Sequence, residues 1–218
     1  MRTQFDAQLK ELNLDMLKMA GEVENIINMS TSALMDGDKN LAKEAVLYDY
    51  QINDLERQIE RRCLKLLLQQ QPVASDLRRI SSALKMITDM ERIGDQAADI
   101  AELSLRLEQG HEEEKLTHIV KMAGDTTRMV TEAINAYVSG DTALAQKVID
   151  DDDGVDELFN LVKDDLIEMI SQNREVGEQA IDLLMIAKYF ERIGDHAVNI
   201  AEWVVFSITG VHKNSKIM

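Results

Sequence analysis

The chain carries one twelve-residue stretch twice. Residues 91–102 read ERIGDQAADIAE and residues 191–202 read ERIGDHAVNIAE, so that nine of twelve positions are identical at an offset of 100. Lys18-Met19-Ala20-Gly21 likewise returns as Lys121-Met122-Ala123-Gly124, at an offset of 103. A change in loop length between helices would produce this small difference in offset. The self-similarity predicts a tandem repeat of a unit of about 105 residues.

Apolar residues recur at three- and four-residue steps, the spacing typical of amphipathic α-helices. The pattern covers about residues 2–35, 39–70 and 73–108, and again about 112–138, 142–171 and 175–212. Asp36-Gly37-Asp38 and Ser139-Gly140-Asp141 each provide a helix stop followed by an N-cap, while Pro72 and Gly110 interrupt the pattern elsewhere. The sequence therefore predicts six helices of roughly 25–35 residues, each about 40–50 Å long.

Three helices per repeat predict the fold class, because an antiparallel three-helix bundle buries one apolar stripe from each member. We expect an all-α protein made of two such bundles, related by a pseudo-two-fold axis. The first bundle would cover residues 1–109 and the second residues 110–218, with the boundary near Gly110.

The composition of the 218 residues agrees with this expectation. Hydrophobic residues make up 45% of the chain, which is enough for a buried core. Proline occurs once, and aromatic residues make up only 4%. A chain with so few helix breakers and so few strand-favouring aromatic residues is better suited to long helices than to a sheet.

Charge and cysteine content restrict the possible partners and location. Forty acidic residues against 24 basic ones give a net charge of −16, and there is no basic run of the kind that binds nucleic acid or an anionic membrane. The lone Cys63 cannot form an intramolecular disulfide. The N-terminal residues lack the apolar core of a signal peptide, and apolar residues 203–211 are too few to span a bilayer. We expect a cytoplasmic protein without membrane insertion.

Paired carboxylates are the most specific chemical feature of the repeated stretch. Glu91 and Asp95 are spaced i, i+4, as are Glu191 and Asp195. Residues at this spacing point only about 40° apart on a helix, one turn above the other. Like charges in this position weaken a helix by a few tenths of a kcal/mol, and yet both repeats contain the pair.

The second helix of each repeat offers further acids. Asp152 and Asp156 are spaced i, i+4, and Asp49 and Asn53 occupy the matching positions in the first half. Because the second and third helices of an antiparallel bundle are neighbours, these acids could face the first set. Oxygen ligands suit magnesium, manganese, calcium or iron, and carboxylates also bind zinc. The alternative is a solvated acidic face with no ligand.

Gly94 and Gly194 lie between the paired acids, although a glycine inside a helix costs about 1 kcal/mol relative to alanine. Close approach of a bound metal cluster would explain them, and so would tight packing of a neighbouring helix. The following Arg92 and Arg192 positions are expected to form ion pairs with a neighbouring helix, and His196 to point away from the acidic stripe.

Several catalytic motifs are absent from the sequence. There is neither a G-x-x-x-x-G-K-[ST] loop nor a G-x-G-x-x-G stretch for nucleotide phosphates, and no G-x-S-x-G elbow. The Glu-x-x-His motif of di-iron bundles occurs only at residues 108–111, across Gly110 in an expected loop. We therefore expect no catalytic residues and no organic cofactor.

The doubled E-R-I-G-D, the Ile-Ala-Glu that follows it and residues 71–78, QPVASDLR, resemble the PhoU family of bacterial phosphate-transport regulators. The resemblance covers essentially the whole chain. It implies two three-helix bundles that bind metal through E/D-x-x-x-D motifs, with iron, zinc, manganese or magnesium as candidate ions. Transferred to this sequence, those motifs predict the metal ligands Asp49, Glu91, Asp95, Asp152, Asp156, Glu191 and Asp195. The sequence departs from the pattern at Asn53, so that the first cluster is expected to carry less charge or to hold fewer ions.

The resemblance also implies a function. It implies a non-enzymatic, cytoplasmic negative regulator that links a phosphate ABC transporter ATPase to a sensor histidine kinase, and we expect a homodimer. The alternative is a metal-storage or metal-dependent hydrolytic protein. Hydrolysis would require an open coordination position and a nearby base, and the sequence offers no base beyond the ligands themselves.

Overall fold

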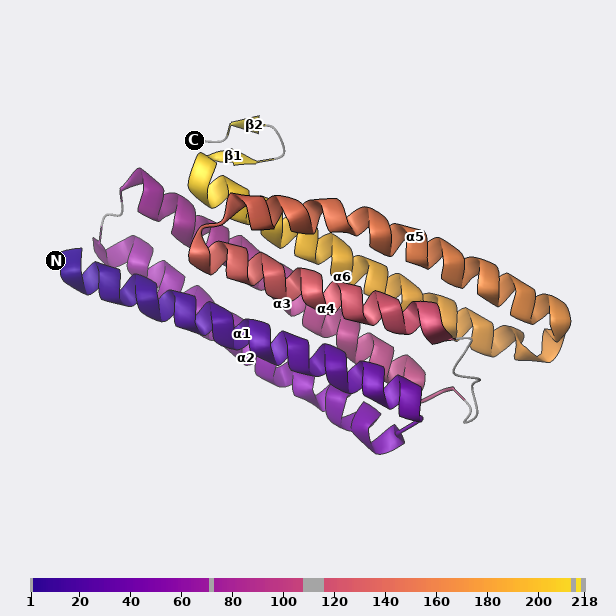
Figure 1. Ribbon diagram of the computed structural model, residues 1–218. Coiled ribbons are helices and arrows are strands. Elements are labelled where there is room, and N and C mark those ends of the chain that lie inside the picture. Colours follow the sequence, from indigo (N-terminus) through magenta and orange to yellow (C-terminus); the bar gives the residue numbers. More distant parts are fainter. Residues whose placement is uncertain (1, 71–72, 108–115, 213–214, 217–218) are drawn as a thin grey trace.

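The computed structural model describes residues 2–70, 73–107, 116–212 and 215–216. Long helices make up almost all of this part of the chain (Figure 1). They are α1 (Arg2–Asp36), α2 (Lys39–Gln70), α3 (Ala74–Ser104), α4 (Thr117–Ser139), α5 (Thr142–Gln172) and α6 (Gly177–Thr209), with a short 3₁₀ turn, η2 (Arg174–Val176), before α6. The predicted all-α class is confirmed.

The two predicted turns join the first and second helices of each half. Gly37 has φ 63° and Gly140 has φ 70°, the left-handed conformation that glycine adopts without steric cost. Asp38 then accepts hydrogen bonds from the backbone N–H groups of Asn40 and Leu41, at 2.9 and 3.1 Å. Asp141 caps α5 in the same way. Because each carboxylate satisfies otherwise unpaired N–H groups, it fixes where the next helix begins.

Helix ends differ from the prediction in three places. The third helix ends at Ser104 rather than 108, and the sixth ends at Thr209 rather than 212, because Gly210 adopts φ 76° and stops it. Two short strands that the sequence did not predict follow, β1 (Val211–His212) paired antiparallel with β2 (Ser215–Lys216). The fourth helix begins at Thr117 within the described residues. The breaks predicted at Pro72 and Gly110, and hence the boundary between residues 109 and 110, lie outside the described residues.

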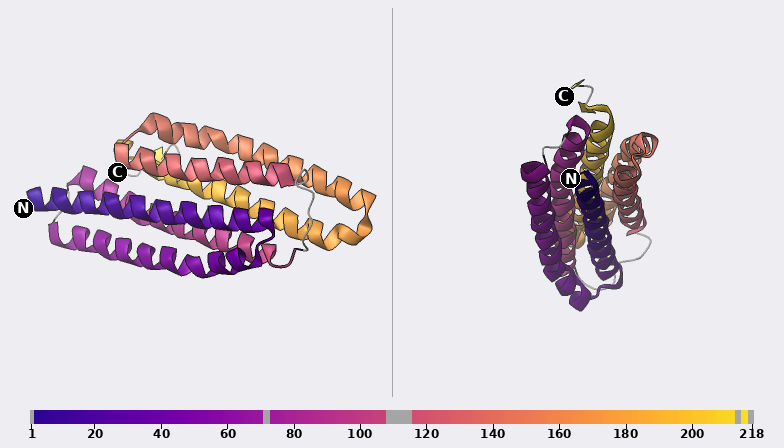
Figure 2. Two further views of the ribbon diagram at one scale, coloured as in Figure 1. Left: turned by 60° about the horizontal axis from the view of Figure 1, so that its bottom comes forward. Right: turned by 90° about the vertical axis from the view of Figure 1, so that its left-hand side faces the viewer.

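Each half is a three-helix bundle, as predicted. Helices α1, α2 and α3 pack against one another, and so do α4, α5 and α6 (Figures 1 and 2). The interiors of the bundles are filled by fully buried aliphatic side chains such as Ile52, Ile93 and Ile193. Full burial of a side chain of this size contributes about 1.5–3 kcal/mol, which is how the repeated apolar stripes stabilise the bundles. Among the described residues, no helix is both long enough and apolar enough to cross a membrane.

The third helices of the two halves, α3 and α6, pack against each other between the bundles. Asp89 Oδ1 lies 2.9 Å from His196 Nδ1 and accepts a hydrogen bond from the Asn199 amide at 3.3 Å. At the matching positions of the other half, Tyr189 is hydrogen-bonded to Asp99. Asp89 of α3 thus meets residues 196 and 199 of α6, whereas Asp99, further along α3, meets the earlier Tyr189. The two helices are therefore antiparallel and are related by a pseudo-two-fold axis. The expectation that His196 points away from the acids was incomplete, because its ring binds the opposite half.

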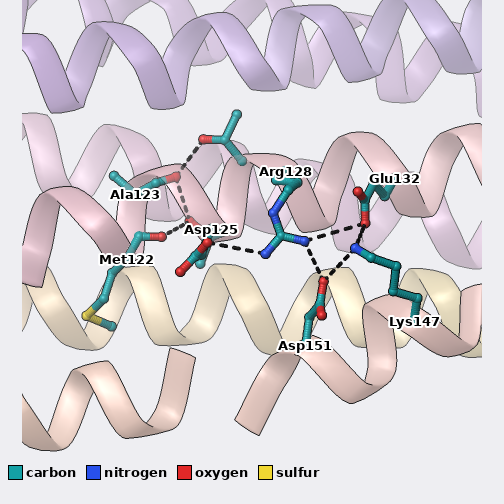
Figure 3. Close-up of polar contacts among 9 residues, drawn as sticks. Met122, Ala123, Asp125, Arg128, Glu132, Lys147 and Asp151 are labelled. Carbon is teal, nitrogen blue, oxygen red and sulfur yellow. Dashed lines mark hydrogen bonds and ion pairs between the residues drawn. The ribbon is translucent and has the colours of Figure 1, made fainter. Parts of the chain in front are cut away.

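The first two helices of each half are tied together at matching positions by different chemistry. In the second half Arg128 contacts Asp125 at 3.2 Å and Asp151 at 2.5 Å, and Lys147 joins Asp151 at 2.9 Å (Figure 3). The equivalents of Asp125, Arg128 and Asp151 in the first half, 103 positions earlier, are Glu22, Asn25 and Tyr48, which are joined by hydrogen bonds. The two halves therefore share a contact between matching positions, which is ionic in the second half and made by hydrogen bonds in the first.

Candidate metal-binding sites

The first acidic cluster lies along the contact between α2 and α3. On α2, Asp49, Asn53 and Glu56 follow one another at steps of four and three residues and so share one face. Asp49 Oδ2 accepts a hydrogen bond from the Asn53 amide at 2.5 Å, whereas Asp49 Oδ1 is buried and accepts none. The facing acids of α3 are Glu91, Asp95 and Asp99.

The carboxylates of the first cluster destabilise one another's charged forms. Burial raises the pKa of Asp49, and the neighbouring Asp95 raises it further. Burial likewise raises the pKa of Glu91 and of Asp99, with Asp95 again the next cause. A bound cation would relieve both the desolvation and the repulsion.

The second acidic cluster occupies the equivalent contact between α5 and α6. Burial, followed by the negative charges of Asp195, Asp156 and Glu191, raises the pKa of Asp152 to about 6. The pKa of Asp195 is raised by burial and then by Glu191, while the positive charge of Lys188 opposes that increase. The structure therefore places the second-half acids that the sequence singled out near enough to raise one another's pKa values, and it does the same for Asp49, Glu91 and Asp95 in the first half.

Two features of these clusters were missed by the sequence analysis. The first is Glu56, whose raised pKa comes from burial and then from Glu60, and which also experiences Asp95 in the cluster. Its spacing of seven residues from Asp49, two helical turns, was the available signal. Glu56 therefore adds to the first cluster a carboxylate that the expectation drawn from Asn53 did not count. The second is Lys188, which forms an ion pair with Glu191.

Side chains of the neighbouring helix fill the space beside both glycines. A Cβ atom at Gly94 would lie 2.9 Å from Ile52 Cδ1 and 3.2 Å from Asp49 Oδ1. At Gly194 it would lie 3.2 Å from Asp152 Oδ1 and 3.5 Å from Val155 Cγ1. Packing of the neighbouring helix is sufficient to account for both glycines. The same packing carries Asp49 and Asp152 toward the third helices.

Arg92 does not pair with a neighbouring helix as expected. Its guanidinium lies 3.2 Å from Asp95 and 3.6 Å from Glu91, both on its own helix. The matching Arg192 lies over the ring of Tyr189, 5.9 Å from the centroid. A surface pair of this kind contributes at most about 1 kcal/mol, so neither arginine fixes the cluster geometry.

The donor atoms fit a hard cation in their chemistry and their charge. Partly buried carboxylates with raised pKa values, one of them with an unpaired buried oxygen, form an oxygen-only donor set. Among the described residues, however, no three acidic, histidine or cysteine side chains are already gathered closely enough to hold an ion. A cation would have to draw the carboxylates together by rotation of their side chains.

The fold and these clusters define a class: a duplicated three-helix protein with an acidic cluster between the second and third helices of each half. A family model described as the PhoU domain matches residues 16–104 and 119–204, and the chain belongs to the PhoU family.

Relatives and solved structures agree over nearly the full chain. A protein of Pseudomonas aeruginosa named phosphate-specific transport system accessory protein PhoU homolog is 35% identical, with 95% of this chain and 86% of that protein aligned. A Clostridium acetobutylicum protein of the same name is 34% identical over 94% of both chains. The crystal structure of PhoU from Pseudomonas aeruginosa superimposes with a TM-score of 0.89 at 34% identity, covering 95% of this chain and 100% of that one. That of the phosphate transport system regulatory protein PhoU from Streptococcus pneumoniae gives 0.88 at 28% identity, covering 95% and 98%.

Proposed function

We propose that this protein is a regulator of phosphate transport that restrains phosphate uptake and phosphate-starvation signalling. The observation that carries the proposal is the whole-length match to relatives named as accessory proteins of phosphate-specific transport systems. The regulator would act in the cytoplasm, as a homodimer, by contacting the ATPase of a phosphate ABC transporter and its sensor histidine kinase. Long exposed helices offer grooves and faces on which partner helices can dock.

We further propose that each half binds a divalent or trivalent cation. Asp49, Glu91 and Asp95 would hold the ion in the first half, with Glu56 as an added ligand, and the ligands of the second half would be Asp152, Asp156, Glu191 and Asp195. The observations that support this are the raised carboxylate pKa values and the unpaired Asp49 oxygen. A bound cation would neutralise the cluster and join the second helix of each half to the third, stabilising the native state.

The protein would act by binding rather than by turnover. Metal-dependent hydrolysis requires a nucleophile or base beside an open metal position. Beside the clusters the described residues include Arg57, Arg92 and Lys188, and the ring of His196 next to Asp195 is engaged by Asp89 of the other half. A metal-loaded protein that hydrolyses phosphoesters, and loses that activity on Glu91→Ala, would support the hydrolytic alternative instead.

Deletion of the gene in its host tests the regulatory role. In phosphate-rich medium the deletion strain should take up more phosphate and express phosphate-starvation genes. Complementation with the unchanged gene should restore repression, and co-purification should recover the transporter ATPase. Normal uptake together with normal starvation-gene expression in the deletion strain would contradict the proposal.

Complementation also separates the two proposals. A Glu91→Gln, Asp95→Asn variant that folds and represses normally would show that regulation does not need the first metal site. A variant that folds but no longer represses would connect the metal to regulation. Lys65→Gln, an exposed change on α2 distant from both clusters, serves as the control.

A further inference from the structure

The two acidic clusters differ in the positively charged side chain that contacts them. In the second half, Lys188 Nζ forms an ion pair with Glu191 Oε2 and lies over the ring of Phe159, 5.5 Å from its centroid. The Glu191 side chain is 15% exposed and that of Lys188 is 38% exposed. The ammonium group is therefore held against a partly buried carboxylate of the cluster, with an aromatic ring beneath it.

Neither of these contacts exists in the first half. Thr88 occupies the position equivalent to Lys188, and its hydroxyl donates to the backbone of its own helix. Glu56 occupies the position equivalent to Phe159 and adds a carboxylate where the second half has a ring. Cations beside the first cluster are Arg92, whose side chain is 57% exposed and lies 3.6 Å from Glu91, and Arg57, whose charge acts on Glu56. An exposed arginine at this distance can move into solvent without losing a packed contact.

We infer that Lys188 is a resident counter-cation of the second cluster, which competes with a divalent metal and makes the two sites unequal. The first site is the tighter one. The inference rests on the metal sites proposed above, and it adds a specificity-determining residue to them. A metal ion at Glu191 must displace the ammonium group or bind beside it, whereas a metal ion at Glu91 meets the exposed guanidinium of Arg92, with the exposed Arg57 beside Glu56.

The charge of the two clusters supports the same order of affinity. The first cluster combines Asp49, Glu56, Glu91, Asp95 and Asp99. The second combines Asp152, Asp156, Glu191 and Asp195, with Asn199 and Phe159 at the positions of the remaining two acids. Because Asp153 also acts on Asp152, the number of carboxylates does not separate the two clusters, and the retained ammonium group is what lowers the affinity of the second cluster for a cation. Removing one positive charge about 5 Å from a divalent ion should tighten binding by about tenfold, even in a medium screened like water.

Manganese titration of variants with a single intact site tests the inference. The second site is measured in the Asp49→Asn, Glu91→Gln background, and the first site in the Asp152→Asn, Glu191→Gln background. Free Mn²⁺ is followed by its electron paramagnetic resonance signal, and thermal unfolding verifies that each variant is folded. Lys188→Gln is then added to the first background, and Thr88→Lys, which installs the ammonium group in the other half, is added to the second.

The first site should bind Mn²⁺ more tightly than the second. Lys188→Gln should tighten the second site by about tenfold, and Thr88→Lys should weaken the first. Lys65→Gln removes the same charge from an exposed position and should change neither affinity. Equal affinities together with no effect of Lys188→Gln would overturn the inference and leave the metal sites standing. Absence of Mn²⁺ binding at both sites would overturn the proposed metal binding, and this inference with it.

Discussion

Replacement of Gly94 by alanine should destabilise the protein, although alanine is the better helix former. In an open helical position the change stabilises by about 1 kcal/mol. At Gly94 the new Cβ atom would meet the fully buried Ile52 at 2.9 Å and Asp49 Oδ1 at 3.2 Å. Because overpacking of a filled interior costs about 1–3 kcal/mol, the net effect should be a loss of about 0–2 kcal/mol in the free energy of unfolding.

Three other glycines provide matched controls for this prediction. Gly21 and Gly124 are helical and have open space where a Cβ atom would lie, so Gly21→Ala and Gly124→Ala should stabilise by about 1 kcal/mol. Gly194→Ala meets Asp152 at 3.2 Å but Val155 only at 3.5 Å, and should stay within about 1 kcal/mol of the unchanged protein. Urea unfolding followed by circular dichroism measures all four. If Gly94→Ala stabilised as much as Gly21→Ala, the close packing of α2 on α3 would be refuted.

Three further predictions concern the charged groups. Since the pKa of Asp152 is raised from 3.8 to about 6, the native state binds more protons than the unfolded state over this interval, and the stability of the cation-free protein should fall as pH rises from 4 to 6. Asp152→Asn should make stability depend less on pH in urea titrations with a chelator present. An unchanged pH dependence would show that Asp152 is not its source. Arg128→Gln should lower the free energy of unfolding by about 1 kcal/mol at low salt and by less at high salt, because it removes an ionic network. Tyr48 is the first-half equivalent of Asp151, which pairs with Arg128, and Tyr48→Phe should show no such salt dependence in the same measurement. The pair Glu191→Ala and Asp195→Ala should remove about half of the bound metal measured by mass spectrometry after dialysis, and a variant that keeps the full amount would disprove the ligand assignment.

Much of the fold could be predicted from sequence because the second copy of the repeat confirms the pattern seen in the first. Two copies of one pattern give six periodic segments, and glycine with aspartate marks the turns through local backbone chemistry. The errors, at the end of α6 and in the two short strands, lie where contacts between distant residues determine the structure. Gly210 ends α6, and in the strand β1 that follows, the centroid of the His212 ring lies 3.9 Å from that of the Trp203 ring. The periodicity of apolar residues along one helix cannot predict such a contact.

The candidate site was predictable only in part, for a related reason. Spacing along a helix shows which acids share a face, and so Asp152, Glu191 and Asp195 were identified. It does not show which residues of the neighbouring helix meet that face. Glu56 was missed although it follows Asp49 by seven residues, because its closeness to Asp95 depends on the register between α2 and α3. Lys188 precedes Glu191 by three residues on α6, so spacing along the helix could have identified that ion pair, and only its position over the ring of Phe159 depends on the register between α5 and α6. That register is set by how Ile52 and Val155 pack beside the two glycines.

The central claim is that each half binds a cation at the contact between its second and third helices. The most direct measurement is anomalous diffraction at the manganese edge from crystals grown with Mn²⁺. We expect two separate anomalous peaks, one among Asp49, Glu91 and Asp95 and one among Asp152, Glu191 and Asp195. Data from such crystals with no peak in either place, or with peaks only elsewhere on the surface, would contradict it.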